Sequence, residues 1–269
     1  MLLEFTKMSG AGNDFVVIDN RAGKIKLTSE QVVLLCHRQR GIGADGLMLL
    51  KPCESKKADW AWDFYNADGG IPEMCGNGAR CFARFVQKVT GSSRSFTFET
   101  VAGIIAASFQ GEKVTIDLTK PLDLRLEEKV ALSTGTQPIH SFKVGNPHAV
   151  LFVEDADKAM VQDLGQEIRR HAHFAPGGTN VNFVQILSPG SIRVRTYERG
   201  VEGETLACGT GVTASALITA KLHQYNSPVK AQVQNGDILE VNFKQTGGEF
   251  TDVKLTGPAK IVFEGKIEI

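Results

Sequence analysis

Two stretches of the chain, MCGNGARCF at residues 74–82 and LACGTGVTA at residues 206–214, carry the same Cys-Gly-x-Gly motif. The motif cysteines are Cys75 and Cys208, which lie 133 positions apart in a chain of 269 residues. A largely apolar segment follows each motif and is typical of a buried helix. The repetition indicates that the chain is built from two related halves.

The same offset of 133 positions aligns further features of the two halves. It matches Gly12-Asn13 with Gly145-Asn146, and each pair precedes an apolar run, which predicts a turn followed by a strand. It also matches Phe64 with Tyr197. The predicted repeat therefore extends well beyond the cysteine motif.

Each half is expected to hold many short strands and one unusually apolar helix, which gives a mixed α/β (α+β) fold. We expect two pseudo-symmetric lobes, each a strand-rich sheet or barrel wrapped around its central helix. The boundary between them is placed near residues 118–128. Residues 1–118 then form the N-terminal lobe with Cys75, and residues 119–258 form the C-terminal lobe with Cys208.

Two local signals add detail to this expectation. Thr28-Ser29-Glu30-Gln31 is a capping box, which predicts a helix from this point to about Arg38. Asn235-Gly236 stands between two apolar runs and predicts a hairpin with a type I′ turn.

The composition favours a small-molecule partner in the cytosol. Hydrophobic residues make up 42% and charged residues 22% of the chain, as in an ordinary globular protein. Thirty basic residues balance thirty acidic ones, so neither nucleic acid nor a membrane surface is an expected partner. No secretory signal is recognisable at the start, and a cytoplasmic location is expected. The five irregularly spaced cysteines favour free thiols over a disulfide scaffold.

A cysteine at the start of a helix lies next to backbone N–H groups and the positive end of the helix dipole, which favour the thiolate. The adjacent glycines let a carboxylate approach the same N–H groups. If the halves face each other, Cys75 and Cys208 can serve opposite sides of one carbon. One thiolate then removes a proton and the opposing thiol returns one, which inverts the stereocentre.

A simpler interpretation applies to either motif alone, because a lone Cys-Gly before a helix is most often a buried cysteine with a flexible cap. Duplication at matched positions favours the functional interpretation. A metal site is not expected, because Cys75 and Cys81 are six positions apart on a helix and lack ligand spacing. Cys36, Cys53 and Cys81 are expected to be structural.

Several motifs together make the chain resemble the diaminopimelate epimerase family over nearly its whole length. They are GAGNDFVVID, GIGADG, NADG, EMCGNGARC, GNPHAV, the ERG and GET segments and LACGTG. The resemblance implies epimerisation of LL- to meso-2,6-diaminopimelate without pyridoxal phosphate, on the route to lysine and peptidoglycan. It further implies no cofactor, no metal, a homodimer, and a C-terminal strand at 259–269 that completes the N-terminal lobe.

The resemblance also assigns the site residues. Cys75 and Cys208 are the acid/base thiols. The N–H groups of Gly76, Asn77, Gly209 and Thr210 hold the reacting carboxylate. The remaining substrate-binding positions are Asn13, Asn66, Asn146, Asn180, Glu198 and Arg199.

Residue chemistry fits these assignments, since Asn, Glu and Arg supply acceptors for an ammonium and donors for a carboxylate. Taken alone, Asn13 or Asn146 beside a glycine is an ordinary turn residue. His148 and Glu198 resemble the residues that tune the protonation of the thiols, although an isolated histidine is more often structural.

Two departures from the family pattern bear on substrate grip. Gly46 stands in GIGADG where a family member often has Gln, and the segment from Arg199 to Gly203 is one residue longer than the commoner form. The longer loop is expected to bulge without displacing Cys208.

Two rival functions remain open from the sequence. One is a racemase of proline, hydroxyproline or another single-headed amino acid that uses the same cysteine pair. The other is a redox-sensitive ligand-binding thiol protein without catalysis.

Overall fold

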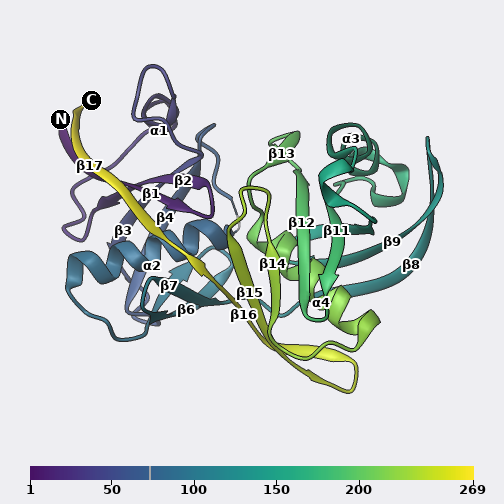
Figure 1. The fold of residues 1–269 in the computed structure, drawn as a ribbon. Coiled ribbons are helices and arrows are strands. Elements are labelled where there is room, and N and C mark those ends of the chain that lie inside the picture. The colour runs from purple at the N-terminus through teal and green to yellow at the C-terminus, as the bar shows by residue number, and fades with distance from the viewer. Residues whose placement is uncertain (73) are drawn as a thin grey trace. The chain divides into compact units, whose positions relative to one another are not determined.

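The computed structural model describes residues 1–72 and 74–269. The chain forms two compact units (Figure 1). Unit 1 comprises Met1–Asp117 with Gly257–Ile269, and unit 2 comprises Leu118–Thr256. The two chain ends meet within unit 1, where the amide of Ile269 donates to the carbonyl of Met1 at 3.0 Å.

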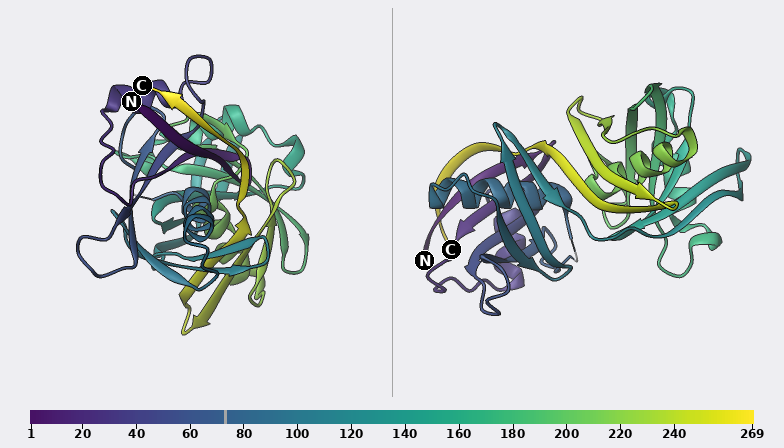
Figure 2. Two further views of the ribbon diagram at one scale, coloured as in Figure 1. Left: turned by 90° about the vertical axis from the view of Figure 1, so that its left-hand side faces the viewer. Right: turned by 90° about the horizontal axis from the view of Figure 1, so that it is seen from below.

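Unit 1 is a single curved sheet with one helix inside it. Its strands are β1 (Leu2–Gly10), β2 (Asn13–Asp19), β3 (Gly46–Pro52), β4 (Trp60–Asn66), β5 (Phe96–Thr100), β6 (Gly103–Gln110), β7 (Lys113–Asp117) and β17 (Lys260–Glu268). They pair in the order β17-β1-β2-β3-β4-β5-β6-β7. Helix α2 (Gly76–Thr90) contacts β1 and β2 near one end of this order and β7 at the other. Seen end-on, α2 lies inside the strands of its unit (Figure 2).

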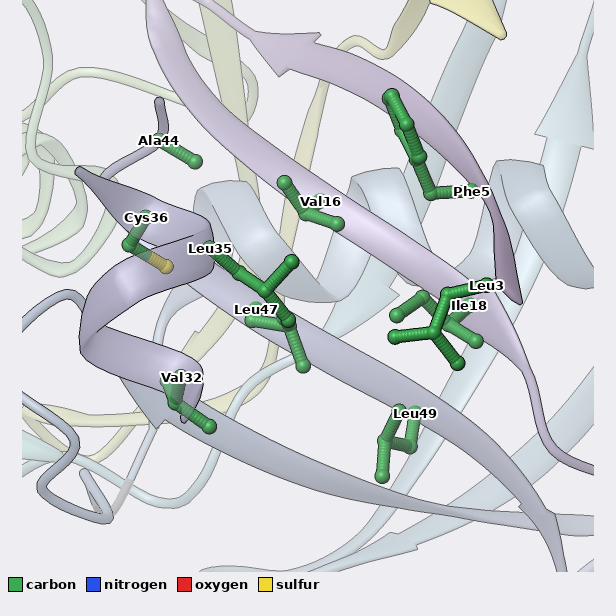
Figure 3. Close-up of a cluster of buried hydrophobic side chains, with 10 residues drawn as sticks. All are labelled: Leu3, Phe5, Val16, Ile18, Val32, Leu35, Cys36, Ala44, Leu47 and Leu49. Carbon is green, nitrogen blue, oxygen red and sulfur yellow. The ribbon is translucent and has the colours of Figure 1, made fainter. Parts of the chain in front are cut away.

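Strands β2 and β3 are buried on both faces, which explains their unbroken apolar runs FVVI and LMLL. Phe15 and Met48 belong to the face that α2 covers, while Val16 and Leu47 belong to the other face, on which α1 (Ser29–Cys36) packs. Figure 3 shows this outer cluster, in which side chains of β1, β2 and β3 meet those of α1.

Helix α1 begins as the capping box predicts. The hydroxyl of Thr28 accepts from the amide of Gln31 at 3.3 Å, and the Gln31 side chain accepts from the amide of Thr28 at 3.0 Å. The helix ends at Cys36, two residues before the predicted end. Its position over β3 closes the outer core of unit 1.

Unit 2 repeats this plan. Its strands are β8 (Leu122–Leu132), β9 (Gly135–Val144), β10 (Asn146–Phe152), β11 (Asn180–Ser188), β12 (Ser191–Glu198), β13 (Gly203–Thr205), β14 (Val229–Gln232), β15 (Ile238–Thr246) and β16 (Glu249–Pro258, whose last two residues are part of unit 1). Its helices are α3 (Val161–Arg170), α4 (Gly209–His223) and the short 3₁₀ turns η1 (Ala156–Lys158) and η2 (Ala172–Phe174).

The strand order β8-β9-β10-β11-β12-β14-β15-β16 matches that of unit 1 strand by strand, including the direction of every pairing. In both units the third pairing in this order, β2–β3 or β10–β11, and the fifth, β4–β5 or β12–β14, are parallel. Strand β17 therefore takes in unit 1 the place that β8 takes in unit 2. The expectation of two similar strand-rich units around a helix is confirmed.

Helix α4 is buried along its first twelve residues, from Gly209 to Ala220. It contacts β9, β10, β11, β14 and β15, so that strands surround it as they surround α2. A helix that is apolar on all sides is stable only in such a core. No helix in the described part of the chain is long and apolar enough to cross a membrane.

Two details differ from the sequence predictions. The Asn235-Gly236 hairpin forms, but only Gly236 has positive φ, 87°, whereas a type I′ turn needs positive φ at both central residues. The ungapped match of Phe64 with Tyr197 is also wrong for the sheet. The strand registers place Phe64 opposite Met48 and Thr196 opposite Asn182, which makes Thr196 the equivalent of Phe64.

Candidate active site

Cys75 caps the N-terminus of α2. Its backbone is extended, with φ −139° and ψ 113°, and its sulfur accepts a hydrogen bond from the amide of Gly78 at 3.3 Å. The sulfur also donates to Oδ1 of Asn13 at 3.6 Å. Cys75 therefore stands at the start of a buried helix, as the sequence predicts, and the predicted substrate-binding residue Asn13 lies against its thiol.

The orientation of the Asn13 carboxamide is fixed by Asp45. Nδ2 of Asn13 donates to Oδ2 of Asp45 at 2.5 Å, so Oδ1 is the atom that faces Cys75. Arg38 holds Asp45 in turn, at 2.7 Å. An acceptor therefore faces the sulfur of Cys75 from the side of β2.

A partly buried ion pair anchors this part of β2. Nζ of Lys7 lies 2.8 Å from Oδ2 of Asp14, and the guanidinium of Arg38 contacts the same carboxylate at 3.0 Å. Burial by itself raises the pKa of Asp14, but hydrogen bonds from Arg38 and Lys7 outweigh burial and lower the pKa to about 2.

Asn77, at the second position of α2, is held by a fully buried arginine. Nη2 of Arg80 donates to Oδ1 of Asn77 at 2.9 Å, and Nη1 donates to the carbonyl of Gly76 at 3.2 Å. Nε donates to the carbonyl of Pro258 at 3.4 Å. Arg80 thus ties the first turn of α2 to the chain segment that leads into β17.

Cys208 is the N-cap residue of α4, with an extended backbone like that of Cys75 (φ −115°, ψ 108°), but its sulfur makes no capping hydrogen bond. Its sulfur lies 3.6 Å from Oγ1 of Thr210. Cys208 and Thr210 are both buried, and Gly209 opens the helix between them. The motif residues of both units therefore occupy matching places at helix N-termini, where backbone N–H groups favour an anion.

His148, only 1% exposed, links this helix end to the sheet. Its Nε2 lies 3.0 Å from Oγ1 of Thr210, and its Nδ1 lies 3.4 Å from Nδ2 of Asn182. Burial, with a smaller contribution from the charge of Arg199, lowers the pKa of His148 to about 3. The imidazole is consequently neutral throughout the physiological pH range.

Three predicted residues of unit 2 interlock at the ends of β11 and β12. The side chain of Asn180 accepts from the amide of Arg199 at 2.9 Å and donates to the carbonyl of Pro147 at 3.0 Å. Nη1 of Arg199 donates to the carbonyl of Gly177 at 3.3 Å. Glu198 accepts from the hydroxyl of Thr205 at 2.9 Å. These contacts fix the backbone from which the guanidinium extends.

The other two predicted asparagines stand at strand ends. Asn66 is exposed at the end of β4, directly opposite Gly46, and Asn146 opens β10 opposite Val144. The hydrogen bonds described above orient the side chains of Asn13 and Asn180 but do not involve those of Asn66 and Asn146.

The two departures from the family pattern have structural explanations. A Cβ atom at Gly46 would lie 2.7 Å from the carbonyl oxygen of Tyr65, so β3 and β4 approach too closely for any side chain there. The longer loop is the turn between β12 and β13, in which Gly200 and Glu202 have positive φ, 95° and 57°. Glu202 fixes the turn through an ion pair with Arg169 at 3.0 Å.

Sequence reasoning missed four side chains that shape the site: Asn182, Thr196, Arg80 and Asp45. Asn182 and Thr196 are buried polar residues, and the hydroxyl of Thr196 donates to Oδ1 of Asn182 at 2.9 Å. A signal for Asn182 exists, because the segment NVNFV places it two residues after Asn180 on the same face of an otherwise apolar strand. Arg80 within the apolar α2 is a signal of the same kind.

The remaining cysteines do not belong to the hydrogen bonds described above, although Cys36 and Cys81 are close to charged groups of unit 1. Burial raises the pKa of Cys81 and of Cys36 to about 12, so both are unreactive thiols. Cys53 donates to Oε2 of Glu99 at 3.2 Å. Among the described residues, no cluster of three or more His, Cys, Asp or Glu side chains is arranged to hold a metal.

Solved structures define the class of fold. A hydroxyproline epimerase from Agrobacterium vitis with bound trans-4-OH-L-proline superposes with a TM-score of 0.74 at 16% identity, covering 99% of this chain and 92% of that one. A phenazine biosynthesis protein of the PhzF family from Bacillus anthracis gives 0.75 at 14% identity, with both chains covered completely. At these identities the likeness shows the fold alone.

Sequence comparison defines the family within this fold. The family described as "Diaminopimelate epimerase" matches residues 5–122 and 141–262. A diaminopimelate epimerase of Aquifex aeolicus is 43% identical over 277 residues, covering 98% of both chains. One from Chromobacterium violaceum is 42% identical over 283 residues, covering all of both. The chain therefore belongs to the diaminopimelate epimerase family.

Proposed function

We propose that the protein interconverts LL- and meso-2,6-diaminopimelate by a two-base mechanism, in the synthesis of lysine and peptidoglycan precursors. The observation that supports it most directly is the repetition of one topology, in which each unit presents a cysteine at the N-cap of its buried helix. The choice of diaminopimelate as the substrate rests on the family to which the chain belongs.

The proposed chemistry moves one proton onto the enzyme and another onto the substrate. One cysteine, as thiolate, takes the α-hydrogen as a proton, and the electron pair left on carbon delocalises into the substrate carboxylate. N–H groups of Gly76 and Asn77, and of Gly209 and Thr210, stabilise the growing negative charge. The second cysteine, as thiol, gives its proton to the opposite face. The reverse reaction exchanges the two roles.

Recognition of the distal amino acid centre is proposed for the polar residues at the strand ends. These residues are Asn13, Asn66, Asn146, Asn180, Glu198 and Arg199. The anchored backbone of Arg199 supports this role, since a guanidinium on a fixed base offers a carboxylate a two-pronged contact. We also propose that His148 and Glu198 tune the thiols, that the two units act as catalytic lobes, and that the enzyme is a cytoplasmic homodimer needing neither cofactor nor metal.

The test is incubation with LL-diaminopimelate in deuterium oxide, followed by chiral separation and mass spectrometry. The expected result is meso-diaminopimelate carrying one deuterium at the inverted α-carbon. L-Proline and trans-4-hydroxy-L-proline are the comparison substrates. Inversion of either of these, with none of diaminopimelate, would overturn the proposed substrate and leave a single-headed racemase. A Cys53→Ser variant is the matched control, because the sulfur of Cys53 hydrogen-bonds to Ser55 and Glu99 rather than to a predicted site residue, and it should keep full activity.

A further inference from the structure

The two cysteines are supported by chemically different layers of side chains. Equal strand registers identify the equivalent positions, since Phe15 pairs with Gly46 in β2–β3 as His148 pairs with Asn180 in β10–β11. Two residues further along β3 and β11 stand Met48 and Asn182, which pair with Phe64 and Thr196. Unit 1 thus has Phe15, Met48 and Phe64 where unit 2 has His148, Asn182 and Thr196.

All six side chains are buried, so this difference is built into the cores. In unit 1 the rings of Phe15 and Phe64 pack edge to face with centroids 6.0 Å apart. In unit 2 the same layer is a chain of hydrogen bonds. A buried polar chain is costly unless every member is satisfied, which suggests that it serves a purpose beyond packing.

The direction of these hydrogen bonds is determined by Asn182. Its Nδ2 donates to the carbonyl of Ala149 at 3.0 Å, and a carbonyl can only accept. Its Oδ1 accepts from the hydroxyl of Thr196. The amide is therefore fixed with Nδ2 toward His148, and Nδ1 of His148, 3.4 Å away, must be the unprotonated nitrogen.

The consequence passes through the imidazole to the helix end. A neutral ring without a proton on Nδ1 carries it on Nε2, which then donates to Oγ1 of Thr210 at 3.0 Å. With an acceptor site of Thr210 occupied, its hydroxyl hydrogen is directed to another acceptor, and the sulfur of Cys208 lies 3.6 Å away. Burial keeps His148 neutral, as this arrangement needs.

We propose that Asn182 is a positioning residue which, through His148 and Thr210, directs a hydroxyl hydrogen at the sulfur of Cys208 and so favours its thiolate. The role deepens the proposed function, on which it rests for its catalytic meaning. At Cys75 the side-chain neighbour is the reverse, because the acceptor Oδ1 of Asn13 faces the sulfur and is satisfied by a thiol hydrogen. The side chains of Asn13 and Thr210 thus act in opposite directions on the two thiols, while at Cys75 the amide of Gly78 also donates to the sulfur.

Gly211 makes the arrangement possible. A Cβ atom on Gly211 would lie 2.2 Å from Oδ1 of Asn182, so the amide fits under the first turn of α4 only because position 211 has no side chain. The equivalent Gly78 faces the ring of Phe15 at an ordinary contact distance of 3.4 Å.

The test measures alkylation of each cysteine by iodoacetamide against pH in the full-length protein without substrate, with peptide mass spectrometry to separate the sites. Each rate is normalised to its own plateau at high pH, so that accessibility cancels. In Asn182→Leu the apparent pKa of Cys208 should rise by about one unit, a tenfold loss of thiolate at a given lower pH, while that of Cys75 stays constant. Thr210→Val should give the same shift.

Further arms separate a positioning role from a general loss of packing. Asn182→Leu added to Thr210→Val should cause no further shift, because both changes break one chain. Thr196→Val is the matched control, since the carbonyl of Ala149 still orients Asn182, and it should shift Cys208 by less than a third as much. Nitrogen-15 NMR of wild-type His148 should show a protonated Nε2. For turnover, Asn182→Leu should lower kcat with KM within twofold.

A protonated Nδ1 in wild-type His148, an unshifted Cys208 in Thr210→Val, or equal shifts at Cys75 and Cys208 would each overturn the proposal. The wild-type NMR and Thr210→Val arms decide it even if Asn182→Leu does not fold. The alkylation experiment does not need a substrate. If the pKa shifts appear as expected but diaminopimelate is not turned over, the proposed function is wrong and the role of Asn182 stands.

Discussion

Acidification to pH 5 is expected to destabilise unit 2 through the burial of neutral His148. Its pKa is about 3 in the folded protein and 6.5 in an unfolded chain. Between these values the unfolded chain binds more protons than the folded one, so stability rises with pH throughout this window and falls on acidification. At pH 7 the contribution is negligible. At pH 5 it amounts to a loss of about 2 kcal/mol, or about thirtyfold in the folding equilibrium.

Hydrogen exchange measured by mass spectrometry reports this loss for unit 2 alone. The slowest amides of α4 and β10 exchange through unfolding of the unit, and their protection, corrected for intrinsic rates, should fall about thirtyfold from pH 7 to pH 5. Other groups also titrate, so the decisive quantity is the difference from a His148→Gln variant. That variant is less protected at pH 7 but should lack the thirtyfold pH-dependent part.

His223→Gln is the matched control, since His223 is an exposed histidine of unit 2 at the end of α4, and it should retain the wild-type pH dependence. An equal pH dependence in wild type and His148→Gln would refute the reasoning. It would mean that His148 is protonated in the folded protein, contrary to its contacts with Thr210 and Asn182.

Two further substitutions test the packing around the helix ends. Gly211→Ala should destabilise unit 2 by about 2 kcal/mol, because the new methyl group collides with Asn182. Gly78→Ala should change the stability of unit 1 by no more than about 1 kcal/mol. Hydrogen exchange of α4 and α2 compares the two variants, and equal losses of stability would contradict the geometry. Arg80→Met should cost unit 1 about 3 kcal/mol, because it removes the hydrogen bonds that a buried guanidinium donates to Gly76, Asn77 and Pro258. Urea unfolding followed by tryptophan fluorescence measures this cost, and a loss below about 1 kcal/mol would show that Arg80 is not needed.

The features that the sequence predicted are those encoded locally or by repetition. The capping box at Thr28 fixes the start of α1, and the Gly-Asn pairs precede β2 and β10 as expected. The buried character of α2 and α4 follows from composition alone. The repeat is visible because both motifs mark the same point in the topology.

The features that were missed depend on contacts between distant segments. Asp45 orients Asn13 from the end of a loop 32 residues away, and nothing in either motif indicates this. The pairing of Asn182 with Thr196 depends on strand register, which an ungapped offset displaces by one residue. The type I′ turn predicted at Asn235-Gly236 does not form, because Asn235 does not adopt positive φ. The Asn-Gly dipeptide permits positive φ at both positions but does not require it.

The account depends most on the claim that two cysteines, one from each unit, carry the reaction. The direct measurement is the rate of diaminopimelate inversion in Cys75→Ser and Cys208→Ser, beside the Cys53→Ser control. Each of the first two should lose at least about a thousandfold in kcat, with the control unchanged, because inversion needs both an acid and a base. Wild-type inversion by either single variant would contradict the claim.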